Sequence, residues 1–127
     1  MSPDGKERRR RRTLDVALAL RYQLDACRGT ADMEALVVAD EDGLCLAASG
    51  PAETCHEVAA VLPFLGGRRG DFRGTVLSAR GGMRVLVRTV EFGASELYVC
   101  AVGGTEERRA GELERSVLGV SRILAAA

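Results

Sequence analysis

Residues 35–50 read ALVVADEDGLCLAASG, two short apolar runs separated by three consecutive acids and a glycine. Asp-Gly between two apolar runs is a strong signal for a β-hairpin, because the tight turn needs a positive φ that glycine adopts freely. The sequence therefore predicts strands over residues 33–40 and 44–49, with Asp42 and Gly43 making the turn between them.

The acids at residues 40–42 raise the alternative of a metal or acid–base site. A calcium loop of the EF-hand kind that started at Asp40 would need a glycine where Cys45 stands and a glutamate where Pro51 stands. A catalytic carboxylate pair would need its two members to face each other in a cleft, whereas adjacent acids at a hairpin tip point apart into water. We therefore expect a solvated turn here.

Three amphipathic helices are predicted around this hairpin. Apolar residues recur at helical spacing over residues 13–28, 53–65 and 106–124. Pro63 lies inside the second of these segments and is expected to kink that helix or to end it early, because proline removes a helical hydrogen bond.

Three further strands are predicted between the second and third helices. They read FRGTVLSAR, MRVLVRTVEF and ELYVCAVG, with a turn at Gly81-Gly82 between the first two. The last of them is almost continuously apolar, as is typical of a central strand covered on both faces. The predicted order is α-β-β-α-β-β-β-α, an α/β (α+β) fold.

The composition limits the possible class of protein. A chain of 127 residues is long enough for one domain with a buried core. Aromatic residues make up only 4% of the chain and tryptophan is absent, which argues against the base-stacking surfaces of nucleic-acid-binding proteins. No apolar run approaches the roughly 20 residues that a membrane span needs. We expect a cytoplasmic protein that binds no nucleic acid.

The charge is unevenly distributed along the chain. Six of the 18 basic residues, Lys6 and Arg8–Arg12, lie before residue 13 together with two of the 18 acids, which leaves 12 basic and 16 acidic residues for the rest. A terminal block of like charge is usually disordered. We therefore predict a disordered basic tail at residues 1–12 before a domain at 13–127. The tail is expected to be solvated, with contact to anionic lipid or nucleic acid as the alternative.

The residues of nucleophilic and metal chemistry are few. The single histidine, His56, follows Cys55, and neighbours on a helix diverge by about 100°, so the two are not expected to share a metal or a proton. Cys27, Cys45 and Cys100 show no metal-ligand spacing with Cys55. We expect no catalytic residue, cofactor or disulfide. A thiol enzyme stays open only if Cys45 or Cys55 lies in a cleft with a lowered pKa.

More apolar surface is predicted than one core contact requires. Val61 lies at the side of the apolar face of the second helix, and Phe64 points well away from that face. Phe72, Val76 and Leu77 fall on the third strand. A strand at the edge of a sheet presents unpaired backbone groups. An edge strand beside an apolar helix would form a surface for self-association or for binding a different chain.

The hairpin sequence and the element order resemble the Roadblock (dynein light-chain) family over residues 13–127. The resemblance implies a profilin-like three-layer sandwich, in which a five-stranded antiparallel sheet lies between the second helix and the other two. It also implies a protein without catalytic activity. Members pair through the second helix and third strand, and act as regulators or partners of small Ras-like GTPases or as adaptors in motor and polarity complexes.

The same resemblance implies a pairing surface on this chain. Its expected members are Glu57, Ala60, Val61, Phe64, Leu65, Phe72 and Val76. The expected function is a dimerising scaffold or regulator that binds itself or another Roadblock-type chain, and a small Ras-like GTPase or a polarity or motility signalling complex. The alternative is a profilin-like or PAS-like small-ligand sensor, in which Arg84, Arg88 or His56 would point into a cavity.

Overall fold

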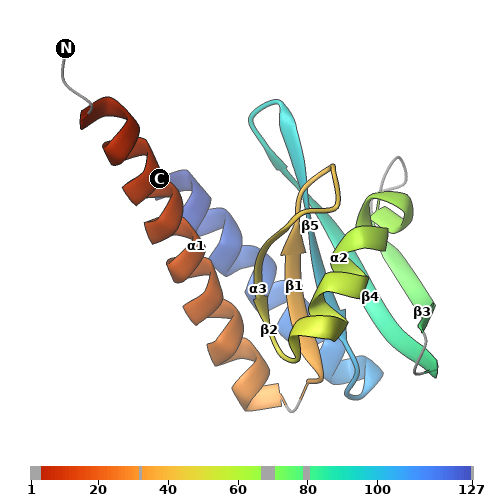
Figure 1. The fold of residues 1–127 in the computed structure, drawn as a ribbon. Helices are drawn as coiled ribbons and strands as arrows, with labels where there is room; N and C mark the ends of the chain where they lie inside the picture. The colour runs from red at the N-terminus through yellow and green to blue at the C-terminus, as the bar shows by residue number, and fades with distance from the viewer. Residues whose placement is uncertain (1–3, 32, 67–70, 79–80, 127) are drawn as a thin grey trace.

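A computed structural model describes residues 4–31, 33–66, 71–78 and 81–126, without the side chains of residues 4–14, 30 and 31. Its elements follow the predicted order α-β-β-α-β-β-β-α (Figure 1). They are α1 (Asp4–Ala31), β1 (Ala35–Ala39), β2 (Cys45–Ser49), α2 (Ala52–Gly66), β3 (Phe72–Ser78), β4 (Gly81–Phe92), β5 (Ser95–Val102) and α3 (Glu106–Ala126).

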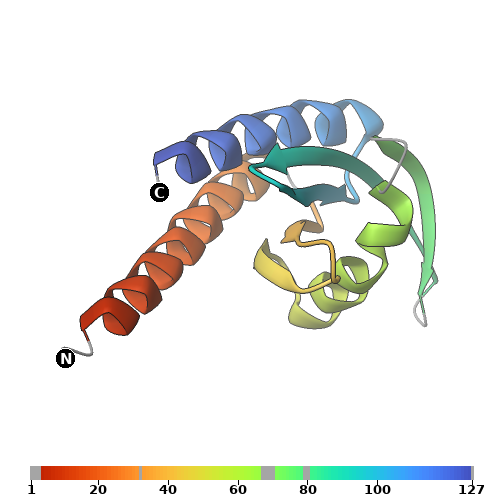
Figure 2. The same cartoon turned by 90° about the horizontal axis from the view of Figure 1, so that it is seen from above.

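The strands form one five-stranded sheet in the order β2-β1-β5-β4-β3, and each neighbouring pair is antiparallel. Helix α2 covers one face of the sheet, and α1 and α3 cover the other (Figure 2). This arrangement confirms the predicted three-layer sandwich. It leaves β2 and β3 at the two edges of the sheet.

The sheet separates two cores built mainly from valine, leucine and alanine. Leu24, Val99 and Leu113 belong to the core under α1 and α3, whereas Leu62 and Cys100 belong to the core under α2. Strand β5 lies at the centre of the sheet and is buried from residue 97 to residue 102, as its apolar sequence predicted. Successive β5 side chains alternate between the cores because strand residues alternate between faces.

The acidic stretch between β1 and β2 is a hairpin turn, as predicted. Gly43 has φ +81°, a backbone conformation that favours glycine. The carboxylate Oδ1 of Asp40 accepts hydrogen bonds from the backbone N–H groups of Asp42 (2.9 Å) and Leu44 (3.0 Å). Glu41 Oε1 accepts a 2.6 Å bond from the backbone N–H of Glu96, at the start of β5. The expectation that all three acids only face water was therefore wrong for Asp40 and Glu41, which hold backbone donors.

Replacing Asp40 with alanine is expected to lower the free energy of unfolding by about 1–2 kcal/mol, because two backbone donors lose their acceptor. Asp40→Asn keeps an oxygen at the Oδ1 position and should recover most of that loss. Chemical denaturation of the three proteins at one concentration measures both effects. Equal stability of Asp40→Ala and the wild type would contradict a structural role for this carboxylate.

Helix α1 begins at Asp4, nine residues before the predicted start at residue 13. The boundary predicted at residue 12 thus coincides with no element boundary, and residues 4–12 continue the helix beyond the sheet (Figures 1 and 2). Arginine has a high intrinsic helix propensity, so a run of arginines can extend a helix that packing has already formed. Disorder of residues 1–12 in solution stays a prediction, and residues 1–3 lie outside the described part of the chain.

Two other boundaries differ from the expected ones. Helix α2 continues through Pro63 to Gly66, so the proline does not end it. A Cβ on Gly66 would lie 2.5 Å from the Tyr98 ring, so glycine allows this last turn to approach β5. The turn expected at Gly81-Gly82 is instead the start of β4, where Gly81 pairs with Ser78.

No helix among the described residues has both the length and the apolar character that crossing a bilayer requires.

Candidate interaction surface

The outward side of α2 carries an exposed stripe of Glu57, Ala60 and Phe64. These positions are three and four residues apart, so they lie on one side of the helix. Phe64 is 87% exposed, the largest exposed fraction among the large apolar side chains described. Leu62, two residues earlier, is fully buried and fixes the rotation of the helix. An aromatic ring is therefore held in water by a helix whose other side is anchored in the core.

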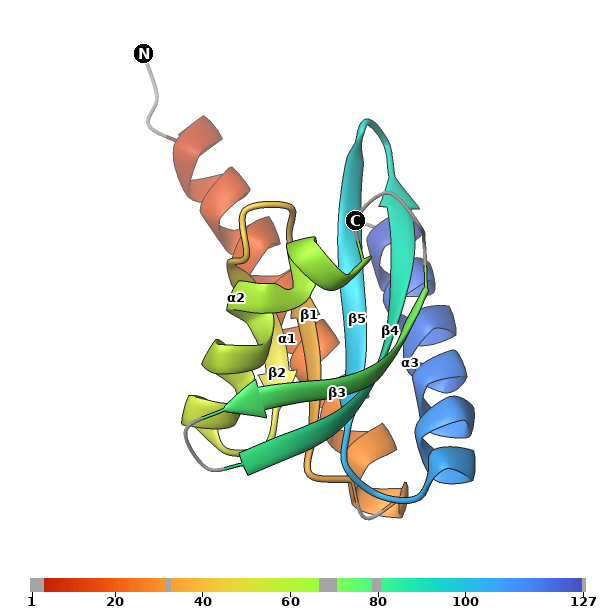
Figure 3. The same ribbon diagram turned by 90° about the vertical axis from the view of Figure 1, so that its right-hand side faces the viewer.

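Strand β3 is an edge strand that pairs only with β4 among the described strands (Figure 3). Phe72 and Val76 are half-buried and pack against the core under α2. The alternate side chains of the strand lie on the other face of the sheet, where Leu77 is 84% exposed. Arg73, also on that face, forms a 2.6 Å ion pair with Glu106 of α3. The outer edge of β3 thus offers backbone groups flanked by apolar side chains.

The structure divides the seven predicted surface residues into two groups. Exposed are the three residues of the α2 stripe, and half-buried are Val61, Leu65, Phe72 and Val76. Leu65 packs on the core under α2 as Phe72 and Val76 do. The structure brings α2 and β3 together on one side of the molecule (Figure 3). Whether the surface pairs with another chain stays a proposal.

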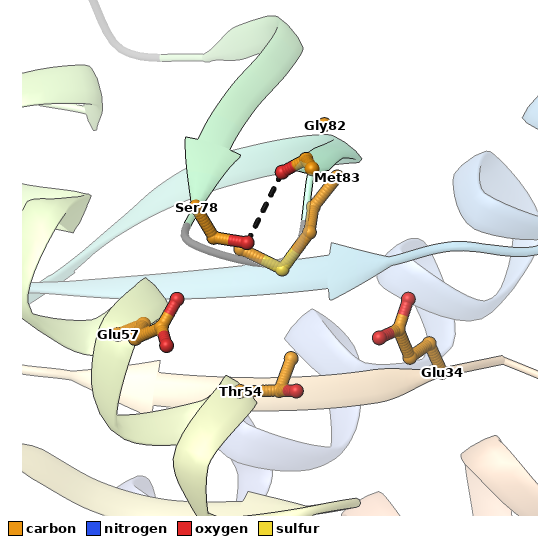
Figure 4. A pocket seen from close by; sticks show the side chains of 7 residues that line it. Glu34, Thr54, Glu57, Ser78, Gly82 and Met83 are labelled. Carbon is orange, nitrogen blue, oxygen red and sulfur yellow. Dashed lines mark hydrogen bonds between the residues drawn. The ribbon is translucent and has the colours of Figure 1, made fainter.

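A polar pocket of about 220 Å³ lies at the opposite end of α2 from Phe64. Its lining comes from the residue before β1, from the first turns of α2 and from the facing ends of β3 and β4 (Figure 4): Glu34, Thr54, Glu57, Ser78, Gly81, Gly82 and Met83. The carboxylates of Glu34 and Glu57 point toward the pocket from opposite sides. Sequence reasoning included only Glu57 among these residues, and no local motif connects the others.

The cysteines do not form a nucleophile site. Cys27, Cys55 and Cys100 are buried, and Cys45 is half-buried. Burial raises the pKa of the Cys55 thiol to about 11, and the neighbouring Cys45 adds to the rise. Burial also raises the pKa of Cys45 and Cys100. A nucleophilic cysteine needs the opposite shift, because the thiolate is the reactive form.

The raised pKa of Cys55 predicts a loss of stability in alkali. The folded state disfavours the Cys55 thiolate. The contribution of the protonated thiol to the free energy of unfolding is therefore fully present below its ordinary pKa of 9.0 and is lost as the pH rises toward about 11. A Cys55→Ala variant lacks this titration. The stability difference between wild type and variant should therefore be constant from pH 6 to about pH 8 and should shift against the wild type above about pH 9. Urea denaturation at each pH measures the difference, and a constant difference up to pH 11 would contradict the shift.

The polar groups of a small-ligand sensor do not converge. His56 and Arg84 are exposed at the surface, and Arg88 Nε lies 3.5 Å from Asp71 Oδ2 in a surface ion pair. None of the three lines the pocket beside α2. Within the described residues, no group of three or more histidine, cysteine, aspartate or glutamate side chains could hold a metal ion.

The geometry defines a Roadblock-like fold with an exposed aromatic residue beside an edge strand. No protein-family model matches the sequence, and no curated protein matches it. Solved structures with the same fold do match. Myxococcus xanthus MglB superimposes with a TM-score of 0.61 at 9% identity, covering 87% of this chain and 90% of that one.

Two further structures agree with that superposition. A structure described as MglB with tetrameric arrangement gives a TM-score of 0.55 at 16% identity, covering 91% of this chain and 90% of that one. The gliding protein MglB from Thermus thermophilus gives 0.51 at 17% identity, covering 92% and 91%. At these identities the likeness establishes the fold alone, and it confirms the Roadblock-like fold that the sequence predicted.

Proposed function

We propose that this chain is a non-catalytic scaffold or regulator of the Roadblock type, which self-associates or pairs with a similar chain through α2 and β3. The observation that carries the proposal is the 87% exposure of Phe64 beside the edge strand β3. Burying a phenylalanine side chain gains roughly 1.5–3 kcal/mol, and pairing an edge strand satisfies its outward backbone groups. One of the MglB structures of the same fold is described as tetrameric, which supports self-association as a use of this fold.

Phe64→Asp is expected to weaken self-association by at least tenfold, because an aspartate in a buried interface would lose its hydration. The matched control is Leu118→Asp, which places the same charge at a 66% exposed leucine on α3. Sedimentation velocity over a hundredfold concentration range measures both. The wild type and Leu118→Asp should form dimers, and Phe64→Asp should stay at the monomer mass of 13.5 kDa. A wild type that is monomeric throughout, or a dimer that Phe64→Asp leaves intact, would remove the self-association part of the proposal.

The partner of the assembled surface is proposed to be a small Ras-like GTPase of a polarity or motility signalling complex. The support is the Roadblock-like fold, together with the description of one structure of this fold as a gliding protein. Purified small Ras-like GTPases of the source organism, loaded with GDP or with a non-hydrolysable GTP analogue, are the probes for calorimetric titration. Binding that depends on the nucleotide and fails with Phe64→Asp is expected. Absence of binding to every GTPase, in both nucleotide states, would refute the proposed GTPase partner and leave the proposed self-association untouched.

The cytoplasmic location stays a prediction from the sequence.

A further inference from the structure

The side of α1 that faces away from the sheet, the outward side of α1, carries two exposed apolar side chains. Leu18 is 48% exposed and Tyr22 is 67% exposed. The two positions are four residues apart, so they lie on the same side of the helix. Leu20 and Leu24, about 200° around the helix from them, are buried in the core under α1 and α3. The packing of α1 on the sheet therefore holds a leucine and a tyrosine in water.

The same helix carries the arginine run. Helix α1 is continuous from Asp4 to Ala31, and its first turns extend past the sheet (Figures 1 and 2). Residues 4–22 include seven basic and three acidic residues, an excess of four positive charges, which leaves 11 basic and 15 acidic residues for the rest of the chain. At a rise of 1.5 Å per residue, the run ends about 9 Å along the helix from Leu18. A positive segment and an exposed apolar pair thus lie on one continuous helix.

Acidic residues close to the apolar pair reduce this positive charge without removing it. Asp15 is exposed on α1. Asp25 Oδ2 lies 3.9 Å from Arg21 Nε, so these two charges form a surface ion pair. The arginine run therefore remains the dominant charge at this end of the helix.

A surface that is both anionic and apolar matches the combination of the arginine run and the apolar pair. Anionic lipid headgroups attract clusters of lysine and arginine, and the acyl layer beneath them can bury a leucine side chain. Tyrosine is enriched where headgroups meet acyl chains, because its ring is apolar and its hydroxyl is polar. A nucleic acid would also attract the arginines, but its phosphate backbone offers no apolar layer that could bury Leu18. The exposed apolar pair therefore favours a lipid surface over a nucleic acid.

We propose that the outward side of α1 binds the surface of an anionic lipid membrane, with the run Arg8–Arg12 against the headgroups and with Leu18 and Tyr22 inserted beneath them. Helix α1 then lies along the membrane surface. An anionic surface repels the acidic remainder of the chain, which favours this orientation. A polybasic run and a small apolar contact are each weak alone, and stable attachment takes two such signals.

The test uses the fluorescence of tryptophan, which the chain lacks. Full-length Tyr22→Trp is mixed with vesicles of phosphatidylcholine and phosphatidylglycerol in equal parts. Its emission should shift to shorter wavelength and should be quenched by lipids brominated in the upper acyl chain. Vesicles of phosphatidylcholine alone should cause neither change. No response of Tyr22→Trp to the anionic vesicles would overturn the proposal.

Phe64→Trp is the matched control for that measurement. Phe64 is also an exposed aromatic residue, but it lies on α2, on the other face of the sheet. The emission of Phe64→Trp should change with neither kind of vesicle. Equal shifts in Tyr22→Trp and Phe64→Trp would show non-specific adsorption and would overturn the proposal.

Two sets of variants separate insertion from electrostatic attraction, with vesicle co-sedimentation as the measurement. Changing Arg8–Arg12 to glutamine should lower the affinity for anionic vesicles at least a hundredfold, and changing them to lysine should lower it less than tenfold because the charge is kept. Leu18→Ser combined with Tyr22→Ser should lower the affinity at least tenfold. Leu77→Ser changes an exposed leucine at the sheet edge opposite β2, the edge strand that α1 contacts, and should have no effect. An unchanged affinity of the Leu18→Ser, Tyr22→Ser protein would overturn the proposal.

A nucleic acid and a second copy are the other possible occupants of this side. If a nucleic acid is the ligand, a fluorescein-labelled DNA duplex should bind more tightly than the anionic vesicles, and Leu18→Ser with Tyr22→Ser should not weaken it. If a second copy covers the outward side of α1, the emission of Tyr22→Trp should shift with protein concentration in the absence of lipid. Either result would overturn the proposal.

Membrane binding by α1 is separable from pairing through α2 and β3, because α2 lies on the opposite face of the sheet from α1 (Figure 2). A monomeric wild type would therefore leave the vesicle measurements unchanged. The double variant Tyr22→Trp, Phe64→Asp should keep the emission shift at saturating anionic vesicles. Loss of the shift in that double variant would contradict a membrane-binding side that lies on α1 alone.

Discussion

Replacing Leu62 with alanine is expected to lower the free energy of unfolding by about 2–5 kcal/mol. Leu62 is fully buried on the inner side of α2, in the core that α2 forms with the sheet. Removing its side chain loses transfer free energy and leaves a cavity that the surrounding strands can only partly close. Because α2 is the only helix described on this face of the sheet, few neighbouring side chains can move to fill that cavity.

The matched control is Leu118→Ala, which makes the same chemical change at a 66% exposed position on α3. Its effect should stay within about 0.5 kcal/mol. Urea unfolding of both variants at a single protein concentration measures the difference and keeps any self-association constant. A cost below about 1 kcal/mol for Leu62→Ala would contradict the packing of α2 on the sheet.

Replacing Gly50 with alanine is expected to cost roughly 3 kcal/mol of stability, the second large effect. Gly50 joins β2 to α2 with φ +128°, a conformation that side-chain-bearing residues rarely adopt. A Cβ there would also lie 2.6 Å from the carbonyl oxygen of Glu34 and 2.9 Å from the Ala35 side chain. The obstructing atoms belong to the chain just before and within β1, so relief requires the backbone to move.

Gly111→Ala is the control for this change. Gly111 lies within α3, and a Cβ there would have no neighbour within 4 Å. Alanine has the higher helix propensity, so this variant should be as stable as the wild type or more stable by up to about 1 kcal/mol. Thermal unfolding of the wild type and the two variants measures both effects. If Gly50→Ala unfolded at the same midpoint temperature as the wild type, the close approach of the β2–α2 connection to β1 would be incorrect.

Features that depend on neighbours in sequence could be predicted. The Asp42-Gly43 turn, the central position of β5 and the start of α3 all follow from local chemistry. For α3, the Thr105 hydroxyl accepts a 3.2 Å bond from the backbone N–H of Arg108, as a threonine just before a helix commonly does. The exposed position of Phe64 also followed from helical periodicity, since Leu62 and Phe64 point about 200° apart.

Features that depend on distant segments could not be predicted. Glu41 bonds to the backbone of Glu96, 55 residues away, and nothing near either residue indicates the contact. The pocket is similar, because Glu34, Thr54 and Met83 come from separate elements and meet only after the sheet forms. The predicted start of α1 was wrong for a different reason. The arginine run has both the charge of a disordered tail and a high helix propensity, and the sequence does not determine which of them prevails.

The central claim is that α2 and β3 form a surface that pairs with another chain. Amide hydrogen exchange in β3 is its most direct test. Alternate amides of an edge strand point away from the sheet, so those of β3 that do not bond to β4 exchange quickly unless a second chain pairs with them. At a protein concentration well above the dissociation constant of the dimer, these amides should be protected from exchange in the wild type. Dilution, or the substitution Phe64→Asp, should remove that protection. Fast exchange of the outward β3 amides in the wild type at every concentration, while β5 stays protected, would contradict the claim.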